Sequence, residues 1–193
     1  MKRSTAIRHL VEMATEASDM LRMRDTDIGW PLFEMWATGE LLDSVAEVES
    51  GTVILLLDVA PGELPWMARH AAGEWVGDRL RLGKRPMLWC YRPSVWPAWN
   101  ARHRQVVRFW SAGDGLDELV IDRLRSGAGV AAEDPGDEAV RQQLIEERSV
   151  GHVHLRRIVD SYWDHEWRRN HRGQEAEDAL WRASAGLIEI DDA

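Results

Sequence analysis

Cysteine is nearly absent from this sequence, and its scarcity narrows the chemistry available. The 193 residues include one cysteine, Cys90, so a disulfide within the chain and a cysteine-rich zinc site are both excluded. Leu88, Trp89 and Tyr91 surround it, which favours a buried strand. Because structural cysteines are often buried, we expect an inert thiol there rather than a nucleophile.

Long hydrophobic runs are also missing. No stretch of about 20 apolar residues occurs, and the basic residues Lys2 and Arg3 have no apolar segment behind them. The sequence therefore predicts neither a signal peptide nor a membrane span. We expect a cytoplasmic protein with no membrane partner.

Positive charge is in deficit, with 33 acidic residues against 24 basic ones and a formal net charge of −9. Such a surface repels phosphate backbones at long range, so we do not expect a nucleic-acid partner. The one concentrated basic run is Arg168, Arg169, His171 and Arg172. We interpret it as the C-terminal end of a helix, where positive charge favours the helix dipole.

Motifs of the common nucleophilic and nucleotide-binding enzymes do not occur. The sequence has no Gly-x-Ser-x-Gly, no Walker loop and no Gly-x-Gly-x-x-Gly. Asp160 and Asp164 share a helix face, but two carboxylates alone make a poor metal site, and no His-Glu-x-x-His arrangement is present. We predict no metal, no cofactor and no catalytic residue; whether the protein is an enzyme stays open, with a non-enzyme favoured.

The hydrophobic pattern predicts an α+β fold: a small mixed β-sheet covered by helices, with a C-terminal helical hairpin. The run Thr52 to Val59 is continuously aliphatic, which is typical of a central strand buried on both faces. We expect one compact unit, a core at 1–125 and a helical segment at 137–193 packed on it. The expected strands are 32–38, 52–59, 86–91 and 106–110, and the expected helices are 3–23, 64–80, 116–124, 137–169 (kinked or split at Gly151) and 175–188.

Residues 30–110 resemble the minimal nucleotidyltransferase fold in the order of their elements. Gly39 stands where that family has a Gly-Ser turn after its first strand, but Glu40 replaces the hydroxyl residue. The family's metal-binding carboxylates would fall near 52–54, where no acid occurs, and Glu47 and Glu49 come too early. The resemblance implies a pseudoenzyme that has lost metal-dependent transfer; another α+β sheet with the same order stays open.

A second resemblance spans most of the chain. The segments 93–100, 107–110 and 162–173 are similar to a bacterial family of uncharacterised proteins. No activity is attached to that family, so the resemblance implies none.

Tryptophan is the strongest anomaly of composition, with 11 residues against two tyrosines and two phenylalanines. Several lie between Trp89 and Trp110, interleaved with arginines, and such pairs stack bases or hold a ligand by cation–π contact. A tryptophan-rich core beneath the proline-rich loop 92–100, or a protein interface, would give the same pattern. The candidate ligand-binding residues are Arg92, Trp96, Trp99, Asn100, Arg108 and Trp110.

Two functional hypotheses follow. The leading one is a non-catalytic, nucleotidyltransferase-like module that binds a protein partner or a ligand. The alternative is a metal-independent small-molecule enzyme or ligand binder that uses the Trp/Arg pocket. A homodimer stays open.

Overall fold

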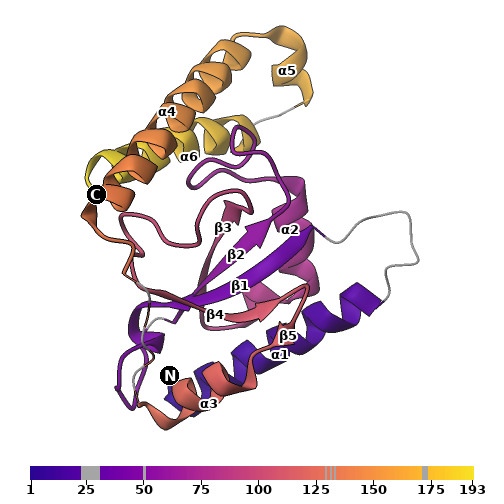
Figure 1. Cartoon of the computed structure of the whole chain (residues 1–193). Coiled ribbons are helices and arrows are strands. Elements are labelled where there is room, and N and C mark those ends of the chain that lie inside the picture. Colours follow the sequence, from indigo (N-terminus) through magenta and orange to yellow (C-terminus); the bar gives the residue numbers. More distant parts are fainter. Residues whose placement is uncertain (23–30, 50, 129, 131, 133, 171–173) are drawn as a thin grey trace.

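The computed structural model describes residues 1–22, 31–49, 51–128, 130, 132, 134–170 and 174–193. Its centre is a five-stranded sheet in the order β3-β2-β1-β4-β5 (Figure 1). β2 and β3 run parallel, and the other neighbours pair antiparallel, so the mixed sheet of the predicted α+β fold is confirmed. The strands are β1 (Leu32–Thr38), β2 (Thr52–Leu57), β3 (Leu88–Pro93), β4 (Val106–Ser111) and β5 (Gly115–Leu116).

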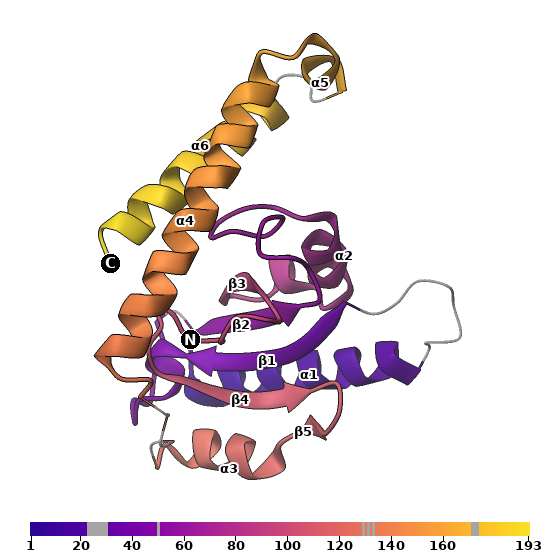
Figure 2. The ribbon, with the colours of Figure 1, turned by 45° about the horizontal axis from the view of Figure 1, so that its top comes forward.

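Helices lie on both sides of this sheet. α1 (Arg3–Arg22) and α3 (Glu118–Ser126) lie beneath it in Figure 2, whereas α4 (Asp137–Tyr162) and α6 (Gln174–Asp191) form an antiparallel hairpin on the other side. The remaining helical elements are α2 (Ala71–Arg79), α5 (His165–Asn170) and the short 3-10 turns η1 (Gly39–Leu41) and η2 (Leu82–Lys84). None of the helices in the described part of the chain combines the length and apolar character needed to cross a membrane.

The main core lies between the sheet and α1. Ile7, Leu10 and Ala14 recur at helical spacing on α1 and are buried against the alternate residues Val53 and Leu55 of β2. The intervening residues of β2 are buried on the opposite face, as predicted for a central strand.

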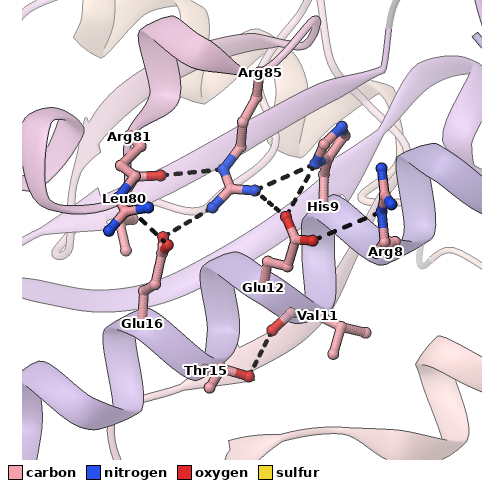
Figure 3. Close-up of polar contacts among 9 residues, drawn as sticks. All are labelled: Arg8, His9, Val11, Glu12, Thr15, Glu16, Leu80, Arg81 and Arg85. Carbon is pink, nitrogen blue, oxygen red and sulfur yellow. Dashed lines mark hydrogen bonds and ion pairs between the residues drawn. The ribbon is translucent and has the colours of Figure 1, made fainter.

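Arg85 locks α1 to the connection between α2 and β3 (Figure 3). Its buried guanidinium donates to Glu12 at 2.5 Å and to Glu16 at 2.8 Å, and its Nε donates to the Leu80 carbonyl at 3.1 Å. The hydrogen bond from Arg85, with a second from His9, lowers the pKa of the Glu12 carboxyl. The end of α2 is therefore held against the same helix that covers the sheet.

The proline-rich loop after β3 covers the opposite face of the sheet. Ala98 and Trp99 pack on Ile54, Leu56 and Val106. The loop is therefore a brace over the second hydrophobic cluster, which matches the interpretation of a core beneath residues 92–100.

A buried ion pair attaches α4 to β3. Arg92 Nη2 donates to Glu147 Oε1 at 2.6 Å, and the two side chains are 2% and 3% exposed. Gln143 donates to the same oxygen at 3.0 Å, and Arg92 Nε donates to the Pro97 carbonyl at 2.9 Å. No other ion pair among the described residues has both partners so deeply buried.

Close packing attaches α6 to the segment that precedes α2. A Cβ atom on Gly186 would lie 2.4 Å from the Trp66 carbonyl oxygen, so only glycine fits there. Trp66 Nε1 also donates to Glu189 at 2.8 Å. The hairpin is thus fixed at two places, by α4 on β3 and by α6 on Trp66.

The helix predicted at 64–80 is wrong in its first half. α2 begins only at Ala71, with the His70 ring accepting from the Ala72 N–H as N-cap. Met67 has φ of +62°, which no right-handed helix contains. Tight packing against α6 overrides the helical periodicity of this stretch.

Two further boundaries differ from the prediction. The third strand begins at Leu88 and extends to Pro93, where an edge position tolerates the missing N–H. α4 runs through Gly151 without a break. This glycine lets α6 lie close to α4, since a Cβ atom on Gly151 would lie 3.2 Å from Cδ1 of Leu187. The helix ends at Tyr162, and Asp164 starts α5 by accepting the Trp167 N–H. The basic run begins within α5, but His171 and Arg172 lie outside the described residues.

We expect that replacing one partner of the Arg92–Glu147 pair destabilises the protein strongly, whereas replacing both partners together does not. Arg92→Met or Glu147→Met leaves one buried charge unpaired and should lower the free energy of unfolding by about 3–5 kcal/mol. The double variant should recover most of that loss. Urea denaturation of all four proteins completes the cycle; a double variant as unstable as the summed single losses would contradict the expectation.

Gly186→Ala tests the contact between α6 and Trp66. Alanine normally stabilises a helix by about 1 kcal/mol relative to glycine, but here the clash with a backbone carbonyl should reverse the sign and cost about 1–3 kcal/mol. Gly151→Ala is the matched control in α4, where the neighbour is the mobile end of Leu187, and it should be neutral or stabilising. Equal melting temperatures for the two variants would refute the close contact.

Candidate functional site

A cleft of about 880 Å³ opens along the outer edge of β3. α2 and η2 form one wall, and α6 together with Arg102 and His103 forms the other. The segment 66–70 lines the cleft between these walls.

The backbone of β3 presents unpaired groups to this cleft. Within the described part of the chain, β3 pairs with β2 alone. The Leu88 N–H donates to Gly51 at 2.8 Å and the Ser94 N–H donates to Leu57 at 2.7 Å, both toward β2. Because successive residues of a strand point to alternate sides, the N–H and C=O groups of Trp89 and Tyr91 face away from β2.

Large apolar side chains lie exposed at the same edge. Leu88 is 58% exposed and Trp89 is 40% exposed. Tyr91 fits against two glycines of α2: a Cβ would lie 3.0 Å from its ring at Gly73 and 2.5 Å from its hydroxyl at Gly77. Small residues on α2 therefore let the helix approach β3, and the edge beyond them stays open.

The Cys90 thiol and the Tyr91 phenol are the two side chains of β3 that could become nucleophilic anions, and both stay protonated. Burial raises the pKa of the Cys90 thiol to about 12. Burial also raises the pKa of the Tyr91 phenol to about 12, and the nearby Glu74 and Asp78 carboxylates act in the same direction. At neutral pH both groups therefore favour their protonated forms, and a protonated thiol is a weak nucleophile.

Aromatic and charged groups make up the wall on the α6 side. Glu189 joins Arg102 at 2.7 Å to Trp66 at 2.8 Å. The His103 ring lies 6.0 Å from the Trp66 ring, and burial together with the Arg102 charge lowers its pKa. Neutral His103 is therefore the favoured form near pH 7.

Arg69 and Arg182 complete the charges of the cleft, and both meet the same carboxylate. Arg182 pairs with Asp178 at 2.9 Å within α6. Arg69, which precedes α2, lies 3.4 Å from Asp178 of α6 and 4.0 Å from Glu74 of α2. It therefore bridges the two walls.

The structure brings four of the candidate ligand-binding residues together beneath α4. Arg92 lies 5.7 Å from the Trp96 ring, and Trp96 Nε1 donates to Glu146 at 2.8 Å. Asn100 is buried, and its side-chain oxygen accepts the N–H groups of Arg102 and His103. Together with Trp99 on the sheet, these residues support the loop that lines the cleft.

Arg108 and Trp110 lie apart from that group. Arg108 pairs with Glu34 at 2.8 Å and with Asp114 at 3.2 Å on an exposed part of the sheet. Trp110 is buried on the opposite face, where it donates to Ser18 of α1 at 2.9 Å. The cause is a bulge that shifts the β1–β4 register between Met35 and Trp36. The residues proposed from sequence do not converge on one pocket, and ligand binding by them stays a prediction.

Sequence reasoning did not select the cleft residues Trp66, Glu74, Asp78 and Arg182. A usable signal existed in β3 itself. Its apolar run ends at Pro93, and proline within a strand indicates an edge position.

The glutamates of the nucleotidyltransferase resemblance serve a local contact. Gly39 has φ of +66° and opens η1, as a turn glycine would. The Glu49 N–H donates to the Glu40 carboxylate at 2.6 Å, and Glu47 and Glu49 are exposed. Among the described residues, no group of three histidine, cysteine, aspartate or glutamate side chains could hold a metal ion.

His103 should make stability depend on pH. Its folded pKa lies below the unfolded value of about 6.5, so the unfolded state takes up the proton first as pH falls. The free energy of unfolding should therefore drop between about pH 7.5 and pH 5.5, and His103→Gln should reduce that drop. Urea titrations across this range measure it, and above about pH 8 the two proteins should run parallel. If His103→Gln leaves the pH dependence of the free energy of unfolding unchanged below pH 7, His103 is not the group responsible.

Comparison with known proteins gives one match. No curated protein and no solved structure matches the chain. One family model matches, and it covers residues 1–193, which confirms the resemblance to an uncharacterised family. The chain therefore belongs to the family described as Domain of unknown function (DUF7711).

Proposed function

We propose that this protein is a non-catalytic interaction module that binds an extended segment of a partner protein as an additional strand beside β3. One observation carries the proposal: the backbone groups of Trp89 and Tyr91 face an open cleft instead of another strand. Addition of a strand to a free sheet edge is a recurring mode of peptide recognition, in which main-chain hydrogen bonds supply affinity.

The usual protection against strand addition is confined to the end of β3. Natural sheets block their edges with lysines, prolines, bulges or inward-pointing charges, and β3 has the buried Arg92 and then Pro93 at its end. Its first half presents Leu88 and Trp89 to solvent, and the strand pairs with β2 without a register shift. Such an edge supports a binding role.

The walls of the cleft favour a single strand. One extended residue occupies about 160 Å³, given a rise of about 3.3 Å, a strand spacing of about 4.8 Å and a sheet spacing of about 10 Å. A cleft of about 880 Å³ thus holds about five residues, close to the length of β3. Residues of α2 and α6 line the cleft on either side of the edge, which favours one strand as the occupant.

A binding role also agrees with the titration of the cleft. Cys90 and Tyr91 stay protonated, and Arg102 and Arg182 are paired with carboxylates. Within this proposal the protein is a bacterial, cytoplasmic pseudoenzyme: it keeps the turn at Gly39, but β2 carries no carboxylate.

A small aromatic ligand is the second candidate. The tilted Trp66 and His103 rings beside Arg102 favour it, because such groups stack on a planar molecule. Binding of this kind would not require the β3 backbone.

Backbone pairing can be separated from side-chain contact at Trp89. The probes are terminally blocked heptapeptides in which Thr alternates with Lys, Glu or Gln. Trp89→Thr keeps the outward N–H and removes the ring, whereas Trp89→Pro removes both. We expect Trp89→Pro to bind the best probe about three- to tenfold more weakly than Trp89→Thr, the value of one hydrogen bond.

Fluorescence polarisation measures these affinities. Circular dichroism verifies that both variants fold, since an edge strand tolerates proline. If no probe binds, or if the two variants bind equally, strand addition is excluded. In that case a thermal-shift screen of small aromatic compounds tests the second candidate.

A further inference from the structure

The unpaired charge in the cleft lies on one wall. Arg102 and Arg182 each have a carboxylate within 3 Å on the α6 side. On the α2 side, Glu74 is exposed and its one ion pair is the 4.0 Å contact with Arg69. Asp78 is exposed, and its carboxylate has no ion-pair partner among the described residues. Arg69 also meets Asp178 at 3.4 Å, so the three arginines around the cleft are balanced by Glu74, Asp178 and Glu189. The surplus left for an occupant is therefore the negative charge of Asp78.

We propose that the bound segment carries lysine or arginine at every second position, with these side chains facing Glu74 and Asp78. The inference rests on the proposed strand addition beside β3 and names the chemistry of the partner. Side chains of an added strand alternate between the two faces of the sheet, so only one set meets α2.

The spacing of the two carboxylates fits this alternation. Glu74 and Asp78 are four residues apart on α2, which corresponds to a rise of about 6 Å along the helix. Alternate residues of a strand are about 6.6 Å apart. Two successive basic side chains on one face therefore match two successive carboxylates on the helix.

Contacts with β3 place the carboxylates on the cleft side of α2. Gly73 and Gly77 both lie against Tyr91, and Glu74 and Asp78, one residue further along the helix, both line the cleft. Both carboxylates act on the Tyr91 phenol, whose pKa they help to raise. Arg79 is turned away and lies 5.7 Å from the Trp75 ring. Arg69, which precedes α2, contacts Glu74 at 4.0 Å, whereas Asp78 has no ion-pair partner among the described residues.

The charge of the whole protein supports the same partner. A formal net charge of −9 attracts a cationic segment at long range and repels an acidic one. Selectivity would arise from both effects, since an acidic segment would face exposed carboxylates of like charge.

The three heptapeptides test this directly. We expect the Lys probe to bind full-length protein about three- to tenfold more tightly than the Gln probe, with the Glu probe weakest. Because the carboxylates are exposed, this preference should shrink as salt increases from about 50 mM to 500 mM. Glu74→Lys/Asp78→Lys should reverse the order and favour the Glu probe.

The matched control is Glu118→Lys/Asp122→Lys on α3. It changes net charge equally with an exposed pair at the same spacing, but α3 lies far from the cleft (Figure 1). It should keep the preference for the Lys probe.

The outcomes separate this inference from the proposed function. If no probe binds, strand addition itself fails. If the Gln probe binds as tightly as the Lys probe, or if the α2 and α3 variants behave alike, strand addition stands and the basic segment is ruled out.

Discussion

The buried ion pair between Arg92 and Glu147 holds the C-terminal hairpin on the sheet. Desolvation of two charges is costly, and it is offset here by a short contact and by added hydrogen bonds from Gln143 and to the Pro97 carbonyl. Because Arg92 belongs to β3, the pair anchors α4 beside the edge strand that borders the cleft. The position of α6, and with it one wall of the cleft, depends on this anchor.

The α2 wall depends on close packing, which also helps to place α6. Gly73 and Gly77 let α2 approach β3 around the Tyr91 ring, and Gly186 lets α6 approach the Trp66 carbonyl. A methyl group at Gly77 or Gly186 would meet a neighbouring atom at 2.5 Å or 2.4 Å. The cleft is therefore the space between α2 and α6 at the outer edge of β3. Its lining mixes exposed apolar groups with carboxylates on α2.

Aromatic residues illustrate how far sequence reasoning reached. Tryptophans crowd between Trp89 and Trp110 in the sequence, but the bulge in the β1–β4 register places Trp110 on the α1 face. Trp96 donates a hydrogen bond to Glu146 of α4, whereas Trp89 lies exposed at the open edge of β3. Trp66 joined the cleft from a segment whose periodicity predicted a helix. Sequence spacing could not show these outcomes, because each depends on contacts between distant elements.

Local pattern alone determined the α+β class, the amphipathic α1, the doubly buried β2 and the helical C-terminal segment, since each follows from residue periodicity within one element. The single cysteine likewise excluded a disulfide within the chain without any structure. Only the tertiary structure decided that the edge of β3 borders a cleft, that Arg92 meets Glu147, and that Glu74 and Asp78 line that cleft. These features join residues far apart in the chain, and their geometry is set by packing between elements rather than within them.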